Sequence, residues 1–289
     1  NRRTCSRGLA PTHTEDRPLM RLGEATWNEV DAATRRMADD DGTRSPILLI
    51  PVGSTEQHGP HLPLNTDTLV AEEIAGRALH RTTGLMLGPT ISITASGEHA
   101  GFAGTLSIGT EVMSQVAIEL GRSADWAAGI VFVNGHGGNH EALTRAVDLL
   151  TAERRNVMSW WPKWRRRTDG GPPDLHAGRI ETSLMLAIDP GLVRFELATD
   201  GPDLPLDDLL PRLRADGVRS VSPSGVLGNP DGASGAEGER FISDFVDDLV
   251  LTIEQWRPID PTPHVSTRPD TETDTDKPSP IDASPITHG

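Results

Sequence analysis

Short runs of β-prone apolar residues alternate with longer helical patterns through the middle of this chain. In order we expect strand 47–52, helix 68–81, strand 85–87, helix 111–126, strand 130–133, helix 141–155, strand 157–160, helix 179–188 and helix 237–257. Such alternation is typical of βαβ units, in which a helix carries the chain from one strand to a parallel neighbour. The sequence therefore predicts an α/β fold with a largely parallel central sheet.

The two ends of the chain have a different composition. Residues 1–18 are polar and without pattern, and residues 258–289 hold seven prolines among Thr, Asp and Ser. Segments of this kind cannot bury enough apolar surface to offset the entropy lost on ordering. We therefore expect a disordered leader over 1–18, one folded domain over 19–257 and a disordered tail over 258–289.

Composition excludes several classes of protein. No apolar run reaches the roughly 18 to 20 residues that a membrane-spanning helix needs, so we expect a soluble, cytoplasmic protein that binds no membrane. Cys5 is the only cysteine, which leaves nitrogen and oxygen as metal ligands. A net charge of −15 argues against nucleic acid as a partner, because most of the surface would repel phosphate.

Chemically rich segments follow the predicted strands. Ligands of an open parallel sheet bind beyond the carboxyl ends of its strands. Residues 53–67 follow the first strand, residues 134–139 follow strand 130–133, and residues 176–178 precede a helix. This placement predicts a site at that edge of the sheet.

The first loop carries several possible metal ligands. Glu56 and His58 are two residues apart, so in extended backbone their side chains project to the same side. His61 follows, and Asp67 comes directly after Thr66, which we expect to be a helix N-cap. Any one of these alone reads as an ordinary polar residue of a surface loop. Together, in a loop stiffened by proline, they indicate a metal site.

Two later segments add candidates. His136 emerges from a glycine-rich turn; the turn lacks the Lys and Ser/Thr of a phosphate-binding loop, and it can also cap the next helix through Asn139. His176 lies five residues before Glu181, whose position near a helix N-terminus has a purely structural explanation in the helix dipole. Beside a metal site, however, this carboxylate becomes useful as a ligand.

The charges of these groups fit two divalent cations. Glu56, Asp67 and Glu181 bring three negative charges against four positive ones, which leaves room for one hydroxide. Cations about 3.5 to 4 Å apart need bridging carboxylate and hydroxide to damp their repulsion. Histidine and carboxylate ligands suit Zn, Mn, Fe or Co, and the sequence does not choose among them.

Five ordered motifs resemble those of the creatininase (creatinine amidohydrolase) family across roughly residues 45–190. They are Gly-Ser-Thr-Glu-Gln-His-Gly-Pro-His-Leu-Pro from 53 with Thr66-Asp67, Gly-Glu-His from 97, Gly-Thr-Leu-Ser-Ile-Gly from 104, Asn-Gly-His-Gly-Gly-Asn from 134, and His-Ala-Gly from 176 with Glu-Thr-Ser from 181. The resemblance implies a single three-layer α/β/α domain, a homo-oligomer such as a hexamer, and a two-metal centre that hydrolyses an amide bond.

The resemblance also implies roles for the candidate residues. One metal would be held by Glu56 and His136 and the other by His58, with Asp67 bridging. Creatininase has a ligand Glu two residues beyond the histidine that matches His136, where this chain has Gly138. The departure puts creatinine hydrolysis in doubt, and Glu181 is expected to complete the site as in other branches of the family.

The stretch 51–68 most resembles the mycofactocin-system branch, whose members release a modified C-terminal dipeptide from a ribosomally made precursor peptide. That peptide is the expected substrate, with His176 and Glu181 as catalytic residues. His176 resembles the family's catalytic histidine and would protonate the leaving nitrogen. The alternatives are an amidohydrolase of a small cyclic amide or formamide, and a metal-binding peptide carrier without turnover.

Aromatic and basic residues interleave between 154 and 167. Stacking and charge could serve single-stranded nucleic acid, against which the acidic composition argues, and a solvated face or a subunit contact is the plain alternative. We hypothesise a substrate wall formed by Trp160, Trp161, Trp164 and Arg165, in which the rings meet an apolar group and the basic side chain meets a peptide carboxylate.

Overall fold

The structure is a computed structural model, and it describes residues 20–39, 45–163, 174–202, 204 and 206–256. The leader expected at 1–18 and the tail expected at 258–289 lie outside the described residues. Among the described residues, no helix is long and apolar enough to cross a membrane.

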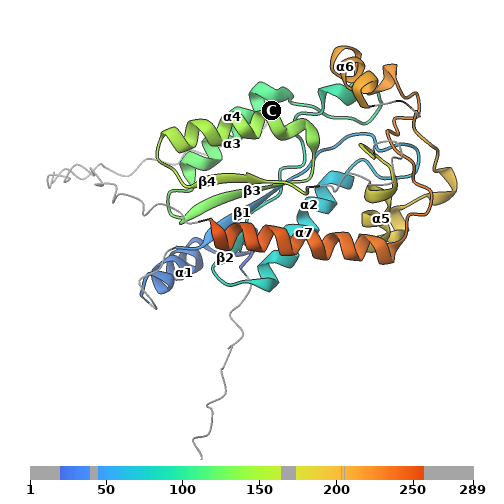
Figure 1. The fold of residues 1–289 in the computed structure, drawn as a ribbon. Helices are drawn as coiled ribbons and strands as arrows, with labels where there is room; N and C mark the ends of the chain where they lie inside the picture. The colour runs from blue at the N-terminus through green and yellow to red at the C-terminus, as the bar shows by residue number, and fades with distance from the viewer. Residues whose placement is uncertain (1–19, 40–44, 164–173, 203, 205, 257–289) are drawn as a thin grey trace, which may run out of the picture. The chain divides into compact units, whose positions relative to one another are not determined.

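Four parallel strands form the sheet, in the order β2-β1-β3-β4 (Figure 1). They are β1 Ile47–Val52, β2 Leu85–Leu87, β3 Gly129–Asn134 and β4 Val157–Trp160. Every residue of β3 is buried, as expected for a central parallel strand that is covered on both faces. The predicted parallel sheet is confirmed.

Seven α-helices lie in the described part of the chain. They are α1 Trp27–Asp39, α2 Thr66–Arg81, α3 Gly109–Ser123, α4 His140–Ala152, α5 Arg179–Ile188, α6 Leu206–Asp216 and α7 Gly235–Gln255. Single 3-10 turns include η2 Gly97–His99 and η3 Gly137–Asn139. The sequence pattern did not predict α1 or α6, and other helix ends differ from the predicted ones by a few residues.

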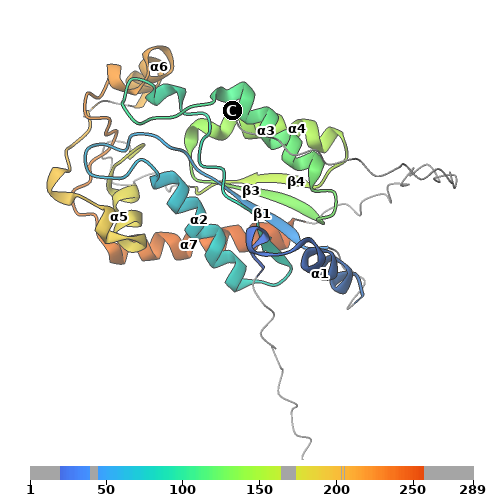
Figure 2. The same cartoon turned by 180° about the vertical axis from the view of Figure 1, so that it is seen from behind.

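The helices cover both faces of the sheet and make three layers, with α3 and α4 on one face and α2 and α7 on the other (Figures 1 and 2). On the first face, Ile50 and Phe132 of the strands belong to one apolar cluster with Met113 of α3 and Leu143 of α4. The second face packs alternate strand residues against α2, α5 and α7. The predicted three-layer α/β/α architecture is therefore confirmed.

The junction between β1 and α2 is fixed by close backbone packing. A Cβ at Gly53 would lie 2.3 Å from Thr68 Cα, so only glycine lets the first loop pass this close to the helix. The prediction that Thr66 is the N-cap was wrong, because Thr66 is the first helical residue and Asn65 precedes it. The Thr66 hydroxyl instead donates to the carbonyl of Pro63, which closes the end of the loop.

Candidate metal centre

The carboxyl ends of β1 and β3 lie side by side, since Val52 pairs with Asn134 in the sheet register. The loops that follow these strands are held together by the side chain of Asn139. Its amide donates to the carbonyl of Gly53 at 3.0 Å and accepts from the backbone N–H of Ala95 at 3.2 Å. Asn139 is the N-cap of α4, as predicted, but its side chain joins three loops and makes no cap hydrogen bond.

Asp67 lies at the centre of the site, in the first turn of α2. One carboxylate oxygen, Oδ1, accepts from His58 Nε2 at 3.0 Å. The other oxygen, Oδ2, lies 2.9 Å from His136 Nδ1 and accepts from the Ser54 hydroxyl at 2.9 Å. A single buried carboxylate is thus shared by two imidazoles that come from the loops after two different strands.

Glu56 is fully buried, yet neither carboxylate oxygen has a hydrogen-bond partner. Oε1 lies 3.2 Å from His99 Nε2, and Oε2 lies 3.2 Å from His136 Nε2. Burial raises the pKa of this carboxyl to about 8. A buried carboxylate without hydrogen bonds is costly. A cation between Glu56 and the neighbouring histidines would remove that cost, so the donor set fits a divalent metal.

The histidines on either side of Asp67 are electrostatically unlike ordinary buried ones. Burial alone lowers the pKa of His58, but Asp67 and the neighbouring glutamates outweigh it and raise the pKa to about 9. Burial lowers the pKa of His136 too, but the nearby carboxylates, mainly Glu56 and Asp67, outweigh it and raise the pKa to about 10. Asp67, between two cationic rings, has a pKa well below its ordinary value although burial opposes this.

Glu181 approaches from the first turn of α5. Its Oε2 accepts from the backbone N–H of Ala177 at 2.5 Å and lies 3.9 Å from His58 Nε2. Ala177 has a φ of 52°, in the left-handed region that non-glycine residues seldom occupy and that clusters at functional sites. Burial raises the pKa of Glu181 to about 7.

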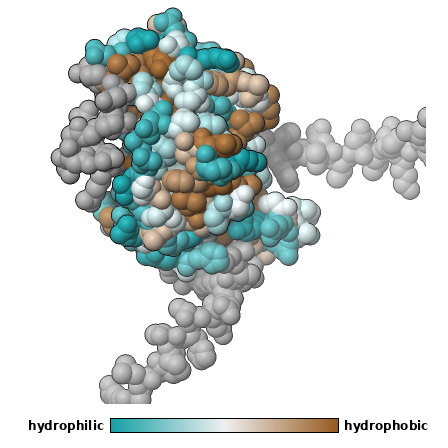
Figure 3. Space-filling view, turned by 90° about the vertical axis from the view of Figure 1, so that its right-hand side faces the viewer, coloured by the Kyte–Doolittle hydropathy of each residue, from teal (hydrophilic) through white to brown (hydrophobic). Residues whose placement is uncertain are grey.

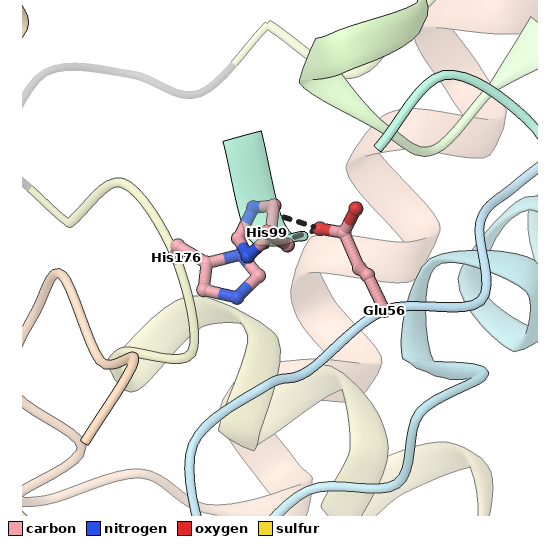
Figure 4. Close-up of side chains that lie close together, drawn as sticks. All are labelled: Glu56, His99 and His176. Atoms are coloured by element: carbon pink, nitrogen blue, oxygen red, sulfur yellow. Dashed lines mark ion pairs between the residues drawn. The ribbon is translucent and has the colours of Figure 1, made fainter. Parts of the chain in front are cut away.

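The predicted catalytic residue, His176, meets two residues to which the sequence assigned no role, Gln57 and His99. His176 Nε2 lies 2.7 Å from the carbonyl of Gln57, so this nitrogen carries the proton and Nδ1 keeps its lone pair. Nδ1 of His176 lies 3.8 Å from Glu56 Oε1. The rings of His176 and His99 are both turned toward Glu56 (Figure 4). Burial first, then the charge of His58, keeps the pKa of His176 well below its ordinary value.

Gln57 fixes the second ring as well. Its side-chain nitrogen is 2.8 Å from His99 Nδ1 and 3.1 Å from the carbonyl of Gly225, and its oxygen accepts from the Gly59 N–H. His99 Nδ1 therefore accepts, and its Nε2 carries the proton. Only the Gly97-Glu98-His99 motif could have pointed to His99, because the contacts of Gln57 join residues far apart in sequence.

Not every predicted side chain reaches this cluster. His61 is buried, but its Nε2 pairs with the Thr182 hydroxyl at 3.0 Å, apart from the groups that could hold a metal. Those groups contain every other predicted ligand: Glu56, His58, Asp67, His136 and Glu181. The structure therefore brings together predicted ligands from three separate segments, 53–67, 134–139 and 176–181.

A cavity of about 310 Å³ opens over the cluster. Its lining includes polar groups such as Glu56, Asp67 and His176, together with apolar side chains, here called the apolar wall, from Trp161, Pro162, Leu175, Leu213, Val218 and Leu227. Trp161, 38% exposed, stacks on His140 with ring centroids 4.4 Å apart. The cavity therefore reaches the surface at an aromatic rim.

The residues predicted to form a substrate wall lie in different places. Trp160 is buried in the apolar cluster beneath α7, and its indole N–H donates to Asp248 at 2.8 Å, so its surroundings give it a packing role. Trp161 lines the cavity. Trp164 and Arg165 lie outside the described residues.

The family model of creatininase, described as creatinine amidohydrolase, matches residues 23–253. This chain belongs to the creatininase family. It is 48% identical over 224 residues to the mycofactocin precursor peptide peptidase of Mycobacterium tuberculosis, a match that covers 74% of this chain and 87% of the relative. The creatinine amidohydrolase of Pseudomonas putida is 30% identical over 266 residues, with 82% of this chain and 97% of the relative covered.

A solved structure described as "Creatininase Mn" matches this creatininase family member with a TM-score of 0.68. It is 25% identical, and the match covers 81% of this chain and 97% of that one. The family and these relatives make the chain a hydrolase that acts on carbon–nitrogen bonds. Its buried histidine and carboxylate groups fit a metal-dependent enzyme.

Proposed function

We propose that this chain is a two-metal peptidase that releases a modified C-terminal dipeptide from the mycofactocin precursor peptide. The observation that carries the chemistry is the sharing of Asp67 by His58 and His136, beside the unpartnered carboxylate of Glu56. The similarity to relatives named as mycofactocin precursor peptide peptidases supports the substrate.

The ligand roles follow the two sides of Asp67. Glu56 and His136 would hold one cation, His58 and Glu181 the other, and Asp67 would be shared by both. Zn, Mn and Fe all suit this donor set, and the similarity to a creatininase solved with Mn supports a divalent metal. When bound, such cations polarise the scissile carbonyl and lower the pKa of water toward roughly 7.

His176 supplies the proton that the leaving nitrogen needs. Its Nε2 proton is held by the Gln57 carbonyl, so the ring cannot rotate without losing a buried hydrogen bond. The free Nδ1 faces the cluster, where it takes up a proton as the nucleophile forms and returns it to the departing amine. A neutral ring suits this shuttle, because an imidazolium could not accept the first proton.

The cavity suits a peptide end better than a small polar amide. Its wall is apolar, and Trp161 and Leu175, each more than a third exposed, place part of that wall at the surface. Figure 3 shows that the face carrying α5 and α6 bears hydrophobic areas among hydrophilic ones. An extended chain could therefore enter with its terminal side chains against the wall.

Mass spectrometry of peptides incubated with metal-replete protein tests the function. We expect the modified precursor peptide to lose the mass of its C-terminal dipeptide, and chelator-treated protein to leave it intact. Creatinine, a formamide and the unmodified peptide are the parallel substrates. Turnover of a small amide with no cleavage of peptide would favour the small-amide alternative, and tight peptide binding without turnover would favour the carrier.

We also propose, from the family resemblance, that the chain works as a homo-oligomer in the cytoplasm. Light scattering of the purified protein tests the first point, for which a hexamer is expected. A monomeric mass with full activity would contradict it.

A further inference from the structure

A second acidic side chain of the cavity lies close to the Glu56–His136 pair. Glu98 lies in η2, after the β2 loop, and its Oε1 is 3.7 Å from His136 Nε2. Glu56, Glu98 and His136 each offer a ligand atom, and these atoms all lie within 4.8 Å of one another. The sequence motifs predict no role for the Glu98 carboxylate.

Gly138 makes room for Glu98. A Cβ at position 138 would lie 2.4 Å from Glu98 Oε1 and equally close to the Ala95 carbonyl and His136 Nε2. At the adjacent Gly137 a Cβ would meet nothing within 4 Å. The space that a side chain at 138 would need is therefore filled by groups of the site, the Glu98 carboxylate among them.

The surroundings of Glu98 offer little other use for its charge. In the described part of the chain no Lys or Arg forms an ion pair with Glu98. The ion-pair partner of Glu98 there is His136. The side chain is 34% exposed at the cavity, so it can move toward a ligand at small cost. Glu56 of the same group has both carboxylate oxygens buried and without hydrogen bonds.

We propose that Glu98 is a further protein ligand of the cation held by Glu56 and His136. A cation between these residues would give the Glu56 oxygens a partner. It would also offset the negative charges of Glu56 and Glu98, which both lie near the imidazole of His136. Asp67, by contrast, has its charge divided between two histidines. The inference rests on the proposed metal centre but makes no use of the substrate.

Retention of metal tests this without any assay of activity. Metal-replete wild-type protein and Glu98→Gln are dialysed against a graded series of chelator concentrations, and bound metal is counted by elemental analysis. We expect two metals per chain in the wild type. In Glu98→Gln, one metal should leave at a chelator concentration at least about 10-fold lower, while the other stays. Equal retention in both proteins would overturn the proposal.

Two controls separate ligation from charge and from folding. Glu141→Gln removes an exposed carboxylate of α4 that pairs with Arg145, and it should retain both metals. Glu98→Asp keeps the carboxylate on a shorter stem and should hold the weakened metal better than Glu98→Gln. Loss of both metals from both Glu98 variants would also overturn the proposal, since it would show a structural role. A wild type without metal would instead refute the metal centre itself.

Discussion

The two halves of the site, on either side of Asp67, are built by different parts of the fold. The Glu56–His136 half comes from the loops after two paired strands, and its closest nitrogen and oxygen atoms are 3.2 Å apart. In the His58–Glu181 half the corresponding distance is 3.9 Å, and Glu181 comes from the start of a helix. Sheet register therefore fixes the Glu56–His136 half, whereas packing of α5 positions Glu181 in the other half.

The two halves also differ in their neighbours. The Glu56–His136 half is flanked by Glu98. His176, by contrast, serves both halves, because it belongs to one group of possible ligands with His58 and Glu181 and to another with Glu56 and His99.

The largest effect should follow from Asp67→Asn, because Asp67 serves both halves. The amide keeps the shape but removes the charge that two histidines share, so both cations should bind at least about 100-fold more weakly. Turnover should then fall to the level of chelator-treated protein. Metal analysis and kcat measure this, with Asp247→Asn, the exposed partner of Arg81, as the control. Selective loss of one metal would show that the halves are independent.

A smaller loss is expected from His176→Ala. Positioned proton transfer contributes about 10²- to 10⁴-fold, so kcat should fall by that factor while both metals remain. His80→Ala, on the exposed surface of α2, is the matched control. If His176→Ala loses the cation of the His58–Glu181 half, the residue is a ligand, and the assignment of proton transfer to it fails.

Much of the fold could be predicted because it depends on local patterns. The apolar runs of β1 and β2 end where the sequence predicts, since buried parallel strands must be apolar and short. Of the two unexpected helices, α6 has a weak local signal. Its Pro211 and several acids are typical of a loop, and the helix is supported by packing against η2 and the 3-10 turn η6 Val218–Ser220.

The site divides in the same way. The histidines and carboxylates next to strand ends were predictable, because their position follows from sequence order. Gln57, Glu98 and His99 were not, because each acquires its role from a partner on another segment; Gln57 meets Gly225, 168 residues away. Trp160 and its neighbour Trp161 look alike in sequence, yet one is buried in the core and the other lines the cavity.

The two halves should also differ in how metal binding responds to pH. A raised pKa means that the metal-free protein holds a proton which the cation must displace, so affinity should rise with pH. Between pH 7 and 8, binding at the first half releases a proton from His136, with a pKa of about 10, and most of one from Glu56, with a pKa of about 8. At the other half, His58, with a pKa of about 9, also releases a proton, but Glu181, with a pKa of about 7, has already lost half of its proton or more.

Calorimetric titration with Mn²⁺ in buffers of different ionisation enthalpy measures these protons. Over that interval the affinity of the Glu56–His136 half should rise about threefold more than that of the His58–Glu181 half, since its cation displaces on average about half a proton more, and one full proton would change the apparent constant tenfold per pH unit. Parallel pH dependences for the two cations would remove this distinction.

An effect of similar size should come from the cavity rim, where Trp161 stacks on His140 at the start of α4 and lines the same cavity as the Glu56–His136 half. An aromatic contact contributes about 0.5 to 1.5 kcal/mol, so Trp161→Ala should raise KM for the peptide by roughly 2- to 13-fold with kcat and metal content unchanged. Trp160→Phe is the matched control. It loses the hydrogen bond to Asp248 and should cost about 1 kcal/mol of unfolding free energy without changing KM. If the KM values respond in the opposite way, the substrate binds away from this half.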